Sequence, residues 1–135
     1  MYIKSSSNID FAETTVVKAI SFGITTLSTT NVNMDKMFVG GIVPRGDDLL
    51  DNQVHKEACY SICALEADNI CSNSKLKNSI AAGCPYAGFV APGSSCTDDD
   101  DENHAFYNNV AHSVMGNGAM IYPDPNFADH KNTCY

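Results

Sequence analysis

The chain has 135 residues, of which 44% are hydrophobic, so it is long and apolar enough for one folded domain and is not disordered as a whole. Its net charge of −8 argues against binding to nucleic acid or to anionic membranes, because both require basic patches. No apolar run approaches the length of about 18 residues that a membrane-spanning segment needs, so no direct membrane span is expected.

The first part of the chain has the composition of β-strands. Residues 11–30 are rich in Thr, Val, Ile and Phe, which favour strands. Within them Ile20, Phe22 and Ile24 alternate with small or polar residues, which is the period of a strand with one buried face. The run is long for one strand, so it predicts two strands or one that extends beyond the domain. A further apolar run at 37–43 ends at Pro44.

The middle of the chain carries a spacing typical of a helix. Asp47 and Asp48 suit a helix N-terminus. Apolar residues then follow at spacings of four, four, four and three: Leu50, Val54, Ala58, Ile62 and Leu65. This pattern predicts a helix over about 48–68. A shorter helix is predicted over 74–82, where Gly83 would end it.

The last third of the chain is predicted to hold one strand and one helix. Residues 84–96 favour a strand between turns, and a helix over 101–115 fits the spacing of Phe106, Val110 and Val114. A β-hairpin around residues 116–118 competes with the end of this helix. No internal repeat is evident.

These predictions give an α+β fold in a single domain, residues 1–135. A Thr/Val/Ile-rich, cysteine-free β part over 1–46 precedes a helical, acidic, disulfide-stapled part over 47–135.

The six cysteines all lie in the second part: Cys59, Cys63, Cys71, Cys84, Cys96 and Cys134. Their even number favours structural disulfides and therefore an extracellular or other oxidising compartment, with buried free thiols as the alternative. Sequence does not select the pairing. Cys59 and Cys63 would share one helix face, where a disulfide between them fits poorly, so we expect each to bond a different partner.

The acidic run CTDDDDENH, residues 96–104, is a candidate metal site. It lacks the glycine and the final glutamate of an EF-hand loop. Asp98, Asp100 and Glu102 could still bind Ca²⁺ from one side of an extended segment. A solvated turn that opens a helix, or a charge contact between subunits, explains the same residues without a cofactor.

No motif for catalysis stands out, so we predict that the chain is not an enzyme. The sequence has no nucleophile elbow, and neither the His55–Cys59 spacing nor the His104–His112 spacing suits a zinc site.

The leading functional hypothesis is a structural, self-assembling subunit of an extracellular filament or virion-type assembly. Its partners would be copies of itself or other subunits, contacted by adding an N-terminal β segment to a neighbouring sheet. Ile20, Phe22 and Ile24 are the predicted assembly contacts. The alternatives are a secreted, disulfide-stapled binding module, with or without dependence on Ca²⁺, and an accessory subunit of a large membrane complex.

Overall fold

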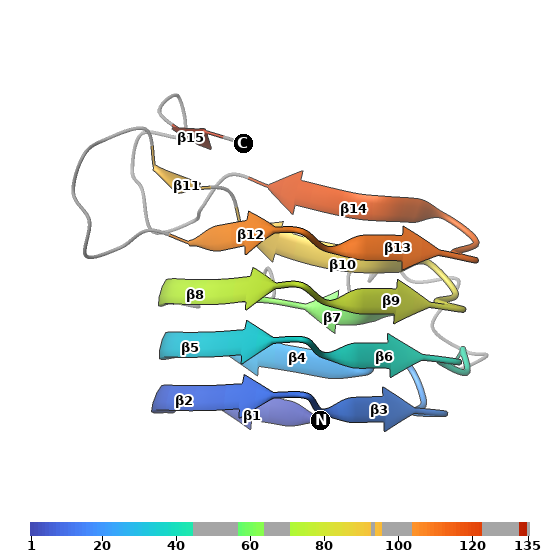
Figure 1. Ribbon diagram of the computed structural model, residues 1–135, viewed down its shortest axis with the longest axis horizontal. Coiled ribbons are helices and arrows are strands. Elements are labelled where there is room, and N and C mark those ends of the chain that lie inside the picture. The colour runs from blue at the N-terminus through green and yellow to red at the C-terminus, as the bar shows by residue number, and fades with distance from the viewer. Residues whose placement is uncertain (45–56, 64–70, 93, 96–103, 123–132, 135) are drawn as a thin grey trace.

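The computed structural model describes residues 1–44, 57–63, 71–92, 94–95, 104–122 and 133–134, and the described part consists of strands, turns and bends (Figure 1). Sheet 1 contains β1 (Tyr2–Lys4), β4 (Ile24–Leu27), β7 (Ala58–Ser61), β10 (Ala87–Pro92) and β14 (Asn117–Tyr122), in that order. Sheet 2 contains β2 (Ser7–Ala12), β5 (Thr30–Asp35), β8 (Ser72–Lys77) and β12 (Ala105–Tyr107). Sheet 3 contains β3 (Thr15–Val17), β6 (Phe38–Gly40), β9 (Ile80–Ala82) and β13 (Val110–His112).

Every strand pair within these three sheets is parallel and in register. The chain visits sheets 1, 2 and 3 in turn and then returns to sheet 1, so each circuit lays one rung on the previous one. This arrangement is a parallel β-solenoid with four rungs, to which β14 adds the start of a fifth. A separate antiparallel pair joins β11 (Ser94–Ser95) and β15 (Thr133–Cys134).

The α+β prediction is therefore wrong for the described residues, which contain no helix. The predicted helix over 48–68 fails at β7, and the rest of that range is mostly outside the described residues. The helix predicted over 74–82 is β8 and β9, and the one over 101–115 includes β12 and β13. An apolar residue at every fourth position satisfies a period of two as well as a period of 3.6, so the spacing was misleading for the helices over 48–68 and 101–115. The helix over 74–82 was predicted from Gly83 as its end, and Gly83 instead lies at the corner after β9.

The strand predictions are closer to the structure. Residues 11–30 do not form one long strand: they hold the end of β2, all of β3 and all of β4. The run at 37–43 contains β6, and the predicted strand at 84–96 contains β10. The alternative hairpin at 116–118 is not formed, because β14 pairs in parallel with β10.

Residues with positive φ recur at equivalent positions of successive rungs. Asn8, Asn31 and Asn73, each the second residue of a strand in sheet 2, have φ values of 56°, 55° and 49° and lie one above another. Asparagine tolerates this backbone conformation better than most residues. At the corner that follows sheet 3, Gly41 and Gly83 occupy equivalent positions with φ near 60°.

The core is a set of columns, each built from one residue of every rung. Phe11, Met34, Leu76 and Phe106 form such a column beneath sheet 2. On the opposite side, the ring of Tyr60 stacks on Phe89 with centroids 4.9 Å apart, and Phe89 meets Phe106 edge to face at 5.2 Å. Burial of apolar side chains between the rungs is the main source of stability for such a fold.

Candidate functional site

The end of the solenoid that contains the first rung presents the outer strand of all three sheets. β1, β2 and β3 are each the last strand of their sheet, so along one edge their backbone groups have no strand partner among the described residues (Figure 1). An unpaired strand edge is a template for pairing with another chain.

The hydrophobic core is incompletely covered at both ends of the solenoid. The apolar residues that pack on the core but remain partly exposed all belong to the first rung or to the last strands: Met1, Ile9, Phe11, Val16, Ala19, Phe106, Ala111, Val114 and Ile121. Their counterparts in the middle rungs are fully buried. Terminal repeats of a solenoid need a cover over this surface, so both ends are candidate docking surfaces.

The three predicted assembly residues do not share one face. Ile20 is 66% exposed and forms a parallel bridge with Val43 at a corner. Phe22 is partly buried, and its ring lies 6.3 Å from that of Tyr2. Ile24 is completely buried in β4. Ile20 and Phe22 therefore remain accessible, whereas Ile24 belongs to the core.

Four of the six cysteines form two disulfides. Cys59 bonds Cys84, and Cys63 bonds Cys71. Cys59 and Cys63 thus have different partners, as predicted, although they lie on a strand and the turn after it. Cys96 and the side chain of Cys134 are outside the described residues.

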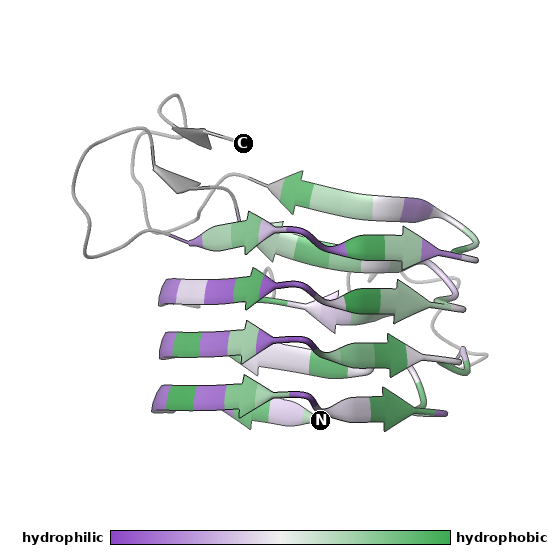
Figure 2. Cartoon of the chain, in the orientation of Figure 1, coloured by the Kyte–Doolittle hydropathy of each residue, from purple (hydrophilic) through white to green (hydrophobic). Residues whose placement is uncertain are grey.

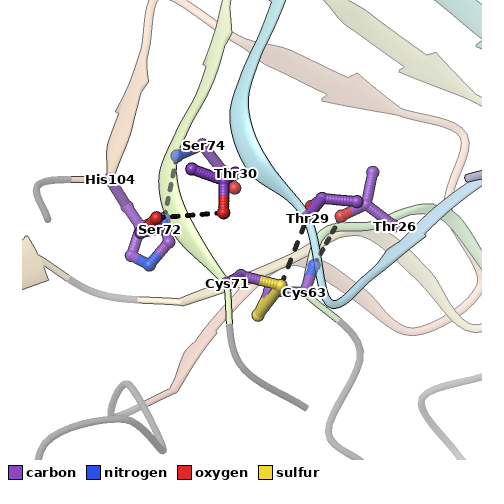
Figure 3. The surroundings of a disulfide bond; sticks show 8 residues. All are labelled: Thr26, Thr29, Thr30, Cys63, Cys71, Ser72, Ser74 and His104. Atoms are coloured by element: carbon purple, nitrogen blue, oxygen red, sulfur yellow. Dashed lines mark hydrogen bonds between the residues drawn. A yellow bond between two sulfur atoms is a disulfide. The ribbon is translucent and has the colours of Figure 1, made fainter. Parts of the chain in front are cut away.

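Threonine side chains of the neighbouring rung surround the Cys63–Cys71 disulfide (Figure 3). The Cys63 backbone N–H donates to Thr26 Oγ1 at 2.8 Å, and the Thr29 hydroxyl lies 3.8 Å from Cys71 Sγ. The disulfide therefore joins two parts of the third rung, and the two threonine contacts connect it to the second rung. Disulfides of this kind are typical of an oxidising compartment.

The predicted calcium ligands Asp98, Asp100 and Glu102 lie outside the described residues, and no group of potential metal ligands occurs in the part that is described. His104, which follows the acidic run, is a buried core residue. Its Nδ1 accepts a hydrogen bond from the Ser74 backbone N–H at 3.2 Å. That contact gives His104 a structural role between the third and fourth rungs.

A ladder of amides on the outer face of sheet 2 was not predicted from the sequence. Asn31 Nδ2 donates to Asn8 Oδ1 at 2.9 Å, and Asn73 Nδ2 donates to Asn31 Oδ1 at 2.7 Å. Beside it, Asn33 Nδ2 donates to Asp10 Oδ1 at 3.0 Å. These side chains line an open hollow of about 340 Å³. The sequence feature that the three ladder asparagines share is that Ile, Val or Ser follows each of them.

Searches of protein-family models, curated proteins and solved structures found no match to this chain. Function must therefore be argued from the geometry. A membrane-spanning helix is likewise not found among the described residues.

Proposed function

We propose that the chain is a structural subunit that assembles end to end with copies of itself, with the N-terminal strand β1 extending sheet 1 of a neighbour. The observation that carries the proposal is the pair of solenoid ends, each of which has, in the described part of the chain, strand edges without a strand partner and a partly exposed core. The outer strands β1 and β14 both pair in parallel within sheet 1. The free edge of β1 in one copy can therefore pair in parallel with the free edge of β14 in a neighbouring copy.

End-to-end contact between two different surfaces is heterologous, and heterologous contacts that do not close into a ring generate filaments. The two disulfides harden each unit and support an extracellular filament or virion-type setting. The proposal assigns no catalytic step to the chain.

The strand count fixes how two copies can meet. Among the described residues, sheet 1 has five strands, whereas sheets 2 and 3 have four. When β14 pairs with β1 of the next copy, sheets 2 and 3 therefore each keep one strand position that no described residue fills. A strand inserted in each gap, from a copy or from another subunit, would cover the partly exposed Phe106 and Phe11.

Engineered cysteines test this join at a defined register. Continuing the columns of sheet 1 places Met120 beside Tyr2 of the next copy, because Tyr2, Thr25, Ser61, Val90 and Met120 occupy equivalent positions. Neighbouring strands lie about 4.8 Å apart, a spacing that a disulfide can bridge. Within one copy the two positions are separated by four strand spacings, about 19 Å, so a bond inside one molecule is excluded.

Mixing the Tyr2→Cys and Met120→Cys proteins under mild oxidation is expected to give a covalent dimer on a non-reducing gel, and the double variant is expected to give a ladder. Each single variant alone is the matched control. Tyr2→Cys mixed with Thr30→Cys, which lies at an exposed position of β5 in sheet 2, controls for random collision. Equal yields from the two mixtures, or monomers only, would contradict the proposal.

A second candidate, a secreted binding module, is favoured by the hollow over the amide ladder. Its walls offer hydrogen-bond donors and acceptors from Asn, Asp and Lys side chains, which suit a small polar ligand. Light scattering separates the two candidates, because the module would stay monomeric at high concentration.

A further inference from the structure

The outer faces of sheets 2 and 3 differ sharply in polarity. Sheet 2 carries Asp10, Asp35, Lys75 and Lys77 on its outer side, in addition to the amide ladder. Sheet 3 carries Thr, Val, Phe, Gly, Ile, Ala and one His at its outward positions. Figure 2 shows this contrast along the strands, which are banded in β2, β5 and β8 and mostly apolar in β3, β6, β9 and β13.

Large apolar side chains are exposed along all four rungs of this side. We call them the apolar face, and its members are Val17, Ile20, Val43, Ile80, Val110 and Met115. Six of the eight large hydrophobic residues that are exposed in the described part belong to it. Ile80 and Val110 are neighbours on paired strands, and Ile20 and Val43 are neighbours at the corner. Exposed apolar side chains that gather on one side of a protein are often part of an interaction site.

We propose that the apolar face packs against the same face of a second copy, so that end-to-end filaments associate side by side in pairs. The inference rests on the proposed end-to-end assembly, because the lateral contact is strong only when it repeats along a filament. We infer that a second copy covers the apolar face because of the charge and the shape of that face.

The net charge of −8 makes two copies repel each other over most of their surfaces. Among the described residues, the outward positions of sheet 3 and the corner beyond it include no Asp and no Glu. The charged residues at their borders include Lys18 and Glu13, and Glu13 forms an ion pair with Lys36 at 3.5 Å. Two copies that meet there keep the acidic residues of sheet 2, such as Asp10 and Asp35, away from the contact. Like charges set opposite each other would cost several kcal/mol.

The part of the apolar face that lies on sheet 3 has the shape of a single sheet face, and Ile20, Val43 and Met115 lie at the corner beyond it. The ring of Phe38 lies over Gly40, where a Cβ would come within 2.9 Å of ring atoms, so the ring fills the space that a side chain would take. Ala82 and Ile80 continue this surface in the next rung. A flat sheet face can pack on its own two-fold copy, as sheets do about 10 Å apart in β-sandwiches.

The size of the face explains why filaments are needed. Four strands span about 19 Å along the axis and the face is about 15–20 Å wide, so one copy offers roughly 300–400 Å². A stable interface needs about 800 Å² from each partner, so two isolated copies pair weakly. In a filament the faces repeat along one side, and successive contacts reinforce one another.

Charge placed on the face tests the inference. Ile80→Lys and Val43→Lys each add a positive charge at an accessible position, and Thr30→Lys adds the same charge to the exposed polar side of the second rung as the control. Negative-stain microscopy is expected to show paired filaments for the natural chain and for Thr30→Lys, and single filaments for the two face variants. Thermal unfolding checks that each variant is folded.

Two outcomes separate this inference from the proposed function. Filaments that remain paired in both folded face variants, or natural filaments that are single, would overturn the lateral contact and leave end-to-end assembly standing. If no filaments form, the proposed function fails, and sedimentation equilibrium at high concentration tests the face alone. The lateral contact then predicts a weak dimer whose association falls about tenfold in Ile80→Lys and is unchanged in Thr30→Lys. Equal association in both would overturn it.

Discussion

Truncating one core column residue by residue tests whether the solenoid ends are open. Phe11, Met34, Leu76 and Phe106 lie in the same column, one in each rung. Met34 and Leu76 are at most 2% exposed, whereas Phe11 and Phe106 are partly exposed. Truncation to Ala should therefore cost less at the two ends than in the middle, although phenylalanine is the larger side chain.

The expected magnitudes follow from burial. Leu76→Ala and Met34→Ala remove fully buried side chains and should each lower the free energy of unfolding by about 3 kcal/mol. A fully buried Phe→Ala would cost about 4 kcal/mol, so partial burial reduces the expected loss for Phe11→Ala and Phe106→Ala to about 2 kcal/mol.

Urea unfolding at low protein concentration, followed by circular dichroism, measures these losses on the isolated chain. The slope of the transition must stay constant across the series, because a changed slope would signal a change in the unfolding reaction. A loss for Phe11→Ala equal to or larger than that for Leu76→Ala would refute the open first rung and remove the main argument for docking there.

Three further predictions follow from individual contacts. Replacing both members of Cys59–Cys84 with Ala should destabilise the chain by about 1 kcal/mol more than the same change in Cys63–Cys71, because the sequence separations are 25 and 8, and equal losses in urea unfolding would count against it. Asn31→Ala should be about 1 kcal/mol less stable than Asn31→Gly, because both lose the amide ladder but only Ala is strained at a φ of 55°, and thermal melts that rank them in the opposite order would contradict this. Burial raises the pKa of Tyr60 above its ordinary value, while a hydrogen bond with Ser79 acts weakly in the other direction, so the stability that its neutral form provides is complete below about pH 10 and is lost as the pH rises further. Stability measured from pH 9 to 11 should fall less steeply in Tyr60→Phe, and identical slopes would show that Tyr60 does not titrate on unfolding.

Strands β3, β4 and β6 could be predicted from composition because Val, Ile, Thr and Phe make up most of their residues. The repeat could not be recognised so easily. Asn8 and Asn31, in the first two rungs, are 23 positions apart, and Asn31 and Asn73, in the second and third rungs, are 42 positions apart. Asn78 and Asn108, which pair at a different corner between the last two rungs, are 30 positions apart. Because the number of residues between equivalent positions differs from rung to rung, the sequence has no constant repeat length, although the structure repeats.

One reason for the wrong helix over 48–68 lies in β7. This strand is buried along its whole length, so it lacks the alternation of a strand with one exposed face. Apolar residues four positions apart then fit a helix as well as a strand. The amide ladder was not predicted because it depends on pairing between rungs. The sequence alone does not indicate that Asn73 lies beside Asn31, which is 42 positions earlier.

The axial rise of the assembled filament tests the account most directly. Pairing of β14 with β1 makes five strand spacings per copy, which predicts a helical rise of about 24 Å, together with a strand-spacing reflection near 4.8 Å along the filament axis. Cryo-electron microscopy of filaments, supported by fibre diffraction, measures both. A rise of about 19 Å would mean that sheets 2 and 3 join directly and β1 does not, and a chain that remains monomeric at high concentration would contradict end-to-end assembly itself.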